Sequence, residues 1–219
     1  MPFWNFYDVF QMKKALDIET WARRDHFHFF RQFEEPFFGL TATVDCRAAY
    51  LDAKAKGQSF FLRYLHDILS AVNAVEAFHY RIEGEQVFVY ERVDASPTVN
   101  RPDNTFGFSY MEFIPDFERF QEKGRAEIAR VQAGSGLELA GFRNNIIHFS
   151  ALPWVHFTSL SHARSFSFPD SVPKISVGKI ITQGEQMLMP LSVHVHHALV
   201  DGYHVGQFFE ILQARMSGQ

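Results

Sequence analysis

The 219-residue sequence contains one cysteine, Cys46, so no disulfide can form within the chain, which is typical of a protein kept in a reducing compartment. Long apolar runs are lacking: none approaches the length that spans a membrane, and no basic start with an apolar core indicates a signal peptide. Basic runs are absent too, and the formal net charge is −4. We therefore expect a cytoplasmic protein that binds neither membranes nor nucleic acid.

Apolar residues, by contrast, are abundant. Hydrophobic residues make up 47% of the chain, and 25 of them are phenylalanines. So much aromatic surface indicates a crowded core or an apolar interface between subunits. The length fits one domain, and the sequence shows no repeat, low-complexity tract or linker. We therefore expect a single domain over residues 1–219.

The apolar period changes along the chain between two residues and about 3.6 residues, which separates strands from helices. The pattern predicts helices near residues 20–35, 47–56, 58–76, 116–133 and 202–216. It predicts strands near residues 38–45, 80–82, 87–90, 106–113, 145–150, 175–182 and 187–197, an extended segment near 7–10, and loops over 94–104 and 161–173. Strands in hairpin pairs that interleave with helices predict an α/β fold, in which helices pack on a mixed β-sheet in a two-layer sandwich.

One stretch near the C-terminus, residues 191–204, combines a strand with polar side chains at its end. Apolar residues alternate with polar ones up to His197, which follows the apolar parity, whereas His194 and His196 point the other way. Asp201 can cap the following helix. Three alternative interpretations apply here. His197 can be a core histidine paired by hydrogen bonds, and Asp201 can be a simple helix cap. His194 and His196 can also bind a metal ion, although this site lacks an obvious third ligand.

The run from His196 to Gly202 resembles the His-His-x-x-x-Asp-Gly signature of coenzyme A-dependent acyltransferases. The longer run 190–198 is similar specifically to the chloramphenicol acetyltransferase family. Two further segments, 21–27 and 149–157, resemble that family's Trp-x-Arg-(Arg/Lys)-Glu-His-Phe and Ser-Ala-x-Pro-Trp-Val-x-Phe motifs. The resemblance implies the family's fold, a homotrimer with active sites between subunits, and acetyl transfer from acetyl-CoA to a hydroxyl of chloramphenicol, hence antibiotic resistance.

Transfer from a thioester to an alcohol needs a base for the hydroxyl proton and a donor for the developing oxyanion, but no metal. The resemblance assigns the base to His197 and the oxyanion donor to Ser150. It pairs Asp201 with Arg23 to hold the site in shape, whereas the residues alone also allow a triad in which Asp201 orients His197. Without the motifs, Arg23 reads as a solvated helix charge and Ser150 as a turn cap.

The remaining candidate residues are expected to bind the acceptor or the coenzyme. We assign Phe30, Phe106, Trp154 and Ser176 to the acceptor, and Lys179 and Phe61 to the coenzyme, whose phosphates favour cations; no residue is assigned to a metal. The sequence departs from the family where Phe30 and Phe61 replace tyrosines and Ile180 replaces an aromatic residue, and the segment 31–39 is partly acidic. These changes leave the base and the oxyanion donor intact and concern the acceptor and the affinity for coenzyme A.

Alternative functions remain open at this point. The same chemistry can act on another hydroxylated acceptor. The chain can also be a catalytically idle trimer that binds an apolar small molecule, although the motif residues favour an enzyme. A metal-dependent hydrolase is the last alternative.

Overall fold

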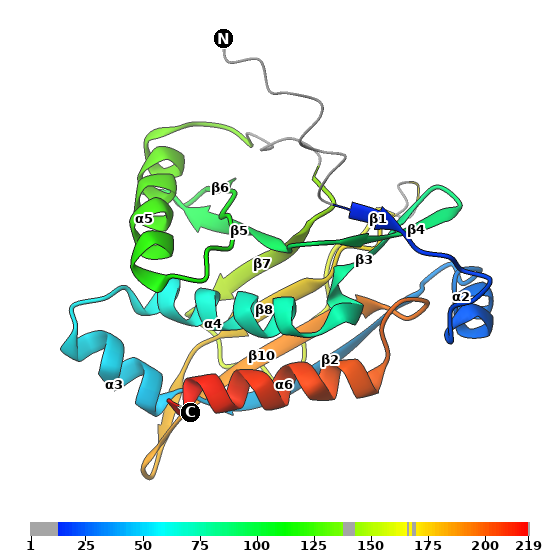
Figure 1. The fold of residues 1–219 in the computed structure, drawn as a ribbon. Coiled ribbons are helices and arrows are strands. Elements are labelled where there is room, and N and C mark those ends of the chain that lie inside the picture. Colours follow the sequence, from blue (N-terminus) through cyan, green and yellow to red (C-terminus); the bar gives the residue numbers. More distant parts are fainter. Residues whose placement is uncertain (1–12, 138–142, 166, 168–169, 219) are drawn as a thin grey trace.

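The computed structural model describes residues 13–137, 143–165, 167 and 170–218 (Figure 1). The main sheet runs, in spatial order, β2 (Phe37–Asp45), β10 (Gln186–His196), β8 (Lys174–Gly178), β7 (Ile146–Leu152), β5 (Asp94–Asn100) and β6 (Phe106–Phe108), with β9 (Ile181–Gln183) paired to β10. β7 is parallel to both of its neighbours, and the other pairs are antiparallel. The sheet is therefore mixed, as the sequence predicts. A second sheet contains β1 (Lys13–Ala15), β4 (Gln86–Tyr90) and β3 (Tyr80–Glu83).

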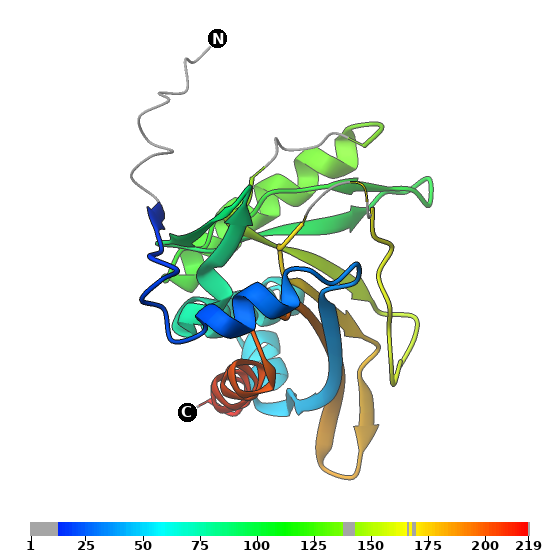
Figure 2. The same cartoon turned by 90° about the vertical axis from the view of Figure 1, so that its right-hand side faces the viewer.

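Helices cover one face of the main sheet. The helices are α2 (Arg24–Phe30), α3 (Arg47–Ala55), α4 (Phe60–Ala74), the short 3-10 helix η1 (Glu76–His79), α5 (Phe117–Ala133) and α6 (Gly202–Met216). Figures 1 and 2 show α4 and α6 side by side across that face, which gives the two-layer arrangement. None of the helices in the described ranges is both long and apolar enough to cross a bilayer.

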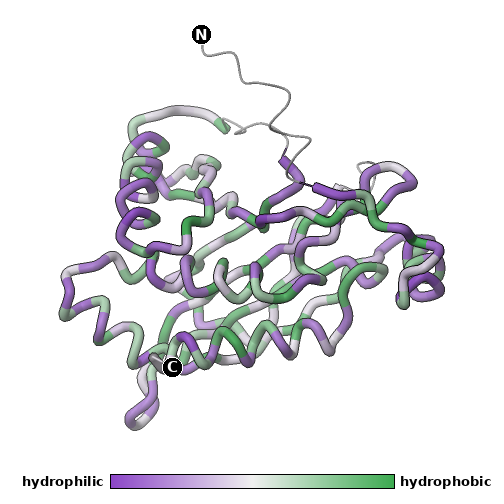
Figure 3. The backbone as a smooth tube through the Cα atoms, viewed as in Figure 1, coloured by the Kyte–Doolittle hydropathy of each residue, from purple (hydrophilic) through white to green (hydrophobic). Residues whose placement is uncertain are grey.

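The period-two pattern of β10 decides which side chains enter the core. Leu191, Val193 and Val195 are fully buried against the helices, and removing such side chains from water is the main favourable term in folding. The apolar residues that face them come chiefly from α4, whose N-terminus is capped by the Ser59 side chain. The more hydrophilic α5 (Figure 3) lies at the edge and buries few residues.

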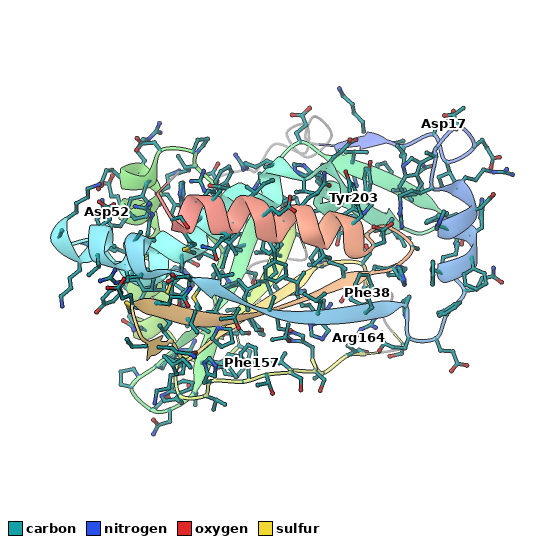
Figure 4. All side chains as sticks on the ribbon, turned by 90° about the horizontal axis from the view of Figure 1, so that it is seen from below. Asp17, Phe38, Asp52, Phe157, Arg164 and Tyr203 are labelled. Atoms are coloured by element: carbon teal, nitrogen blue, oxygen red, sulfur yellow. The ribbon has the colours of Figure 1, made fainter. Side chains whose placement is uncertain are left out.

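The opposite face of the sheet, which we call the outer face, carries the remaining residues of the strands. Here Ser192, His194 and His196 of β10 lie beside Thr41, Gly39 and Phe37 of β2. A Cβ at position 39 would lie 2.2 Å from Nε2 of His194, so any other residue there would displace the His194 ring. Figure 4 separates the two faces: Phe38 lies on the α6 side of β2 and Arg164 on the outer side.

Several expected boundaries differ from the structure. Residues 94–104 were expected to form a loop because of their prolines and asparagine, but 94–100 form β5. Pro97 cannot donate to the sheet, but its carbonyl still accepts hydrogen bonds from the backbone and the hydroxyl of Ser109, at 3.0 and 2.8 Å, and the strand pairs with β7, so tertiary pairing overrides local preference. The expected strand 106–113 is shorter, because the continuous pairing with β5 covers only 106–108; Ser109 and Met111 bond to β5 outside the strand.

The helix expected over 20–35 is also shorter, because α2 begins at Arg24 and ends at Phe30. The chain must reverse direction before β2 starts at Phe37, and Arg23, at the N-cap position, makes no side-chain cap. The expected strand 175–182 divides into β8, which pairs with β7, and β9, which pairs only with β10. The segment expected to be extended near 7–10 lies outside the described residues.

Candidate functional site: an imidazole between two aromatic rings

His197 lies in the turn that directly follows β10, and its imidazole is half-buried between aromatic rings. The ring stacks on Phe30 of α2 at 3.9 Å between centroids and is tilted against Phe38 of β2 at 4.6 Å. Its Nδ1 lies 3.3 Å from the carbonyl oxygen of Val200. Because a carbonyl can only accept, the proton sits on Nδ1, and Nε2 carries the lone pair that a base needs.

The turn around His197 is held by an ion pair between Arg23 and Asp201. Nη1 of Arg23 bonds to Oδ2 of Asp201, and Nη2 donates to the His197 carbonyl at 3.3 Å. The two side chains are 13% and 31% exposed, so the pair is only partly desolvated. Burial opposes the ionisation of Asp201, but the hydrogen bond from Arg23 and nearby positive charge lower the pKa of its carboxyl below the usual value. One contact thus joins α2, the end of β10 and α6.

Asp201 also begins α6. Its carboxylate accepts from the backbone N–H of Tyr203 at 3.0 Å, and His204 accepts from the backbone N–H of Asp201, which together form a capping box. The carboxylate therefore contacts Arg23 and the helix N-terminus, whereas the Nδ1 of His197 faces a backbone carbonyl. In this geometry Asp201 is a structural partner of the turn and does not bond to the imidazole.

Ser150 lies on the outer face of β7, away from His197. The strand register places Ser150, Ser176 and Ser192 side by side on β7, β8 and β10. His197 follows Ser192 by five residues and lies on the helix side of the sheet. Strand spacing and rise per residue then separate Ser150 from His197 by roughly 20 Å within one chain. A single chain thus does not bring the expected base and oxyanion donor together.

Ser150 lines a cavity of about 740 Å³ on the outer face. The cavity is bounded by β7, by residues 162–165 of the segment that follows β7, and by Lys174 at the start of β8. Its lining combines charged and polar side chains with apolar surface, which is the larger share and includes Phe108. This cavity is therefore large enough for a small organic molecule whose hydroxyl contacts Ser150.

The residues assigned to the acceptor occupy different places. Phe30 contacts His197 directly, as described above. Ser176 is fully buried, and its hydroxyl has no hydrogen-bond partner among the described residues. Trp154 is 66% exposed beyond β7. Phe106 is 43% exposed on β6 and packs edge-on against Phe108, which lines the cavity in its place.

The two residues assigned to the coenzyme are also apart from each other. Lys179 is exposed between β8 and β9, and its backbone bonds to the segment after β7. Phe61 is half-buried on α4 and packs at 6.3 Å against the ring of Phe149, on the helix side of the sheet. The structure gives Phe61 a place in the core layer and Lys179 a place on the surface.

His194 and His196, which the sequence also allows as metal ligands, make other contacts. Nδ1 of His194 lies 3.3 Å from the Ser192 hydroxyl, and its ring packs edge-on against His162 at 4.8 Å. His196 is buried, and burial together with nearby Arg164 lowers its pKa to about 4. Over the described ranges, no three or more His, Cys, Asp or Glu side chains are grouped as a metal ion requires.

Sequence reasoning missed three residues of the cavity: His148, His162 and Lys174. Two of them left a signal. His148 precedes Ser150 by two residues, so the strand period puts both on one face, and Lys174 precedes Ser176 in the same way. No sequence pattern indicates His162, because it lies in a segment without regular structure.

Comparison with known proteins gives a consistent result. The family model described as chloramphenicol acetyltransferase matches residues 12–213. A chloramphenicol acetyltransferase of Escherichia coli is 30% identical over 202 residues, which cover 91% of each chain. The E. coli protein named chloramphenicol acetyltransferase 3 is 30% identical over 200 residues, which cover 90% of this chain and 93% of that protein.

Solved structures agree with the sequence comparison. A chloramphenicol acetyltransferase structure superposes with a TM-score of 0.86 at 31% identity, covering 92% of this chain and 98% of that one. A dihydrolipoamide acetyltransferase structure from Azotobacter vinelandii has a TM-score of 0.65 at 13% identity, covering 88% and 86% of the two chains. The second likeness concerns the fold alone.

Proposed function

Because the chain belongs to the chloramphenicol acetyltransferase family and is therefore an acyltransferase, we propose that it transfers an acetyl group from acetyl-CoA to a hydroxyl of chloramphenicol. The observation that carries this proposal is the tautomer of His197. With the proton on Nδ1 directed at the Val200 carbonyl, Nε2 is available as the general base. The rings of Phe30 and Phe38 hold the imidazole in one orientation.

The reaction proceeds in a ternary complex without a covalent enzyme intermediate. Nε2 of His197 removes the proton from the acceptor hydroxyl as its oxygen attacks the thioester carbonyl. The Ser150 hydroxyl donates a hydrogen bond to the oxyanion of the tetrahedral intermediate, a contribution of about 3 kcal/mol for one such donor. The C–S bond then breaks, and the imidazolium returns the proton to the coenzyme A thiolate. No metal takes part in these steps.

This mechanism requires two subunits, since His197 and Ser150 lie roughly 20 Å apart and on opposite faces of one chain's sheet. We propose a cytoplasmic homotrimer in which His197 of one subunit faces the outer-face cavity of the next. The ion pair of Arg23 with Asp201 then acts as a positioning contact, because it fixes the turn that presents the imidazole.

A second candidate, the same transfer to another hydroxylated acceptor, is favoured by the charged side chains in the lining of the cavity. Chloramphenicol carries no charge, whereas Lys174 and Asp170 line the space beside Ser150. A catalytically idle small-molecule-binding trimer is the remaining alternative, which the aligned base and ion pair disfavour.

The test mixes purified protein, acetyl-CoA and chloramphenicol and measures thiol release together with the mass of the acetylated product. We expect product whose formation requires His197. A panel of other alcohols in the same assay separates the two candidates, because thiol release with one of them and none with chloramphenicol would reassign the acceptor. Calorimetry with coenzyme A tests whether the protein is a catalytically idle binding protein, because no binding at about millimolar concentration would exclude an acyl-CoA enzyme.

A further inference from the structure

Two parallel rows of polar side chains cross the outer face at the cavity. The first row is the hydroxyl row Ser150, Ser176 and Ser192. The second, two residues along each strand, is the nitrogen row His148, Lys174 and His194. In a strand this offset places the two rows about 7 Å apart. The cavity therefore has a hydroxyl end, where Ser150 would meet the reacting group, and a cationic end.

The cationic end is assembled by several elements. Lys174 is buried, and its Nζ bonds to Asp170 and donates to the Val172 carbonyl at 3.1 Å. Among its contacts with described residues, this leaves one of its three protons for a ligand. His162 packs on His194, and its buried Nε2 has no hydrogen-bond partner among the described residues.

The charges of the whole lining favour an anion. The positively charged residues are Arg143, Arg164 and Lys174, and the carboxylates are Asp170 and Glu83. Arg164 is paired with Glu35, and Lys174 with Asp170. Glu83 is occupied, because it bonds to Lys13 and to the hydroxyl of Tyr90. Two histidines, His148 and His162, line the cavity as well and can add positive charge.

Both histidines are held neutral by their surroundings. For His148, burial and then the charge of Lys174 lower the pKa, with Arg81 acting in the same direction and Asp170 against it. For His162, burial lowers the pKa to about 4, with further contributions from His194, Lys174 and His148. A negative charge placed beside these two histidines would raise both pKa values, so binding of an anion is linked to uptake of protons.

We propose that the acceptor is a hydroxylated carboxylate, whose anionic group lies against His148, His162 and Lys174 while its hydroxyl lies at Ser150. This inference rests on the second candidate of the proposed function, acetyl transfer to a hydroxylated acceptor other than chloramphenicol, and names the class of that acceptor. A para-substituted benzene ring spans the distance between the two rows, and Phe108 supplies an aromatic surface for it.

The test compares two probes that differ in one charge, para-(hydroxymethyl)benzoate and its neutral amide, para-(hydroxymethyl)benzamide. Thiol release from saturating acetyl-CoA gives kcat/KM for each. We expect the benzoate to be favoured about tenfold at about pH 6, and less at about pH 7.5, where proton uptake by the histidines is weaker. Because both probes use the same base, its ionisation cancels in the ratio.

Variants test whether the preference for the benzoate over the amide arises from the histidines of the cavity. His148→Gln and His162→Gln cannot gain a charge, so each should lower the preference for benzoate, and the double variant should remove its pH dependence. His156→Gln is the matched control, since His156 belongs to the same segment but faces the Lys179 carbonyl outside the lining. A preference that is absent, or equal in the double variant and the control, would overturn the assignment.

Binding measured by calorimetry without acetyl-CoA separates this inference from the proposed function. About tenfold tighter binding of the benzoate with no thiol release from any acceptor would support the anion site and refute the transfer. Release of thiol from chloramphenicol or the amide, with no preference for the benzoate in rate or binding, would refute the anion site and leave the transfer. Failure of both probes to bind would also refute it.

Discussion

At the scale of single residues, the central feature is an imidazole whose tautomer is set by backbone geometry. The Val200 carbonyl lies three residues after His197, in the same turn, so the hydrogen bond that fixes the proton on Nδ1 is local. The carboxylate that would play this part in a triad is instead bonded to Arg23. A neutral acceptor suffices to orient the ring, because stacking on Phe30 already restricts its rotation.

The first prediction concerns this ring. His197→Ala should lower kcat by about 10⁴-fold, since no other group would take the hydroxyl proton. The melting temperature should change little, because the imidazole is half-buried and the ion pair beside it stays in place. The measurement is thiol release with thermal melting, and His26→Ala, an exposed histidine on α2, is the control. Near-normal turnover of His197→Ala would remove His197 from the base role.

The site was predictable from the sequence where it depends on short motifs. His197, Asp201 and Arg23 fall in runs whose residue types and spacing suffice, and the structure brings these three together. The family resemblance favoured the ion pair over the triad, but the residues alone left the choice open, because it depends on where the side chain of Arg23 ends, 178 residues away in the chain. The cavity residue His162 was hidden for the same reason, since only the path of an irregular segment brings it to His194.

At the scale of the elements, strong local signals in the sequence predicted the helices, whereas weaker signals did not predict all of the strands. The apolar period of residues 58–76 and 116–133 and the cap Asp201 placed three helices within a few residues. β5 was missed because Pro97 argues locally against a strand, whereas its pairing with β7 is made by residues about 50 positions later. Helix signals are local and strand pairing is not, which explains the difference.

The second prediction concerns the contact that joins α2, β10 and α6. Asp201→Asn keeps a good N-cap residue but removes the charge that Arg23 faces. We expect a loss of about 1–3 kcal/mol, below the value for a fully buried pair because Asp201 is 31% exposed, together with a lower rate. Thermal melting should show a decrease of several degrees.

The matched control is Asp116→Asn at the N-terminus of α5, where the carboxylate accepts from the backbone N–H of Arg119 at 2.9 Å. This control should leave both melting and rate nearly unchanged. If Asp201→Asn lost activity while its melting temperature stayed the same, Asp201 would act on the reaction through His197, and the triad would be the better description.

At the scale of the whole molecule, the sheet separates the two halves of the chemistry. His197 lies on the helix side of the sheet, as Phe38 and Val195 do, whereas Ser150 and the cavity lie on the outer face. The proposed homotrimer would resolve this separation, because a heterologous interface brings one face of a subunit to a different face of its neighbour. Each interface would then hold one complete site.

The third prediction follows from that arrangement. His197→Ala and Ser150→Ala chains, each nearly inactive alone, should regain activity when they are unfolded and refolded together. An interface works when its base comes from a Ser150→Ala chain and its oxyanion donor from a His197→Ala chain, and random assembly of equal amounts makes about a quarter of the interfaces of this kind. The measurement is thiol release at fixed total protein, with each variant refolded separately as the control. Activity of the mixture equal to the mean of the two separate variants would mean that each site is built from a single chain, and the roughly 20 Å between His197 and Ser150 would then exclude their acting on one substrate.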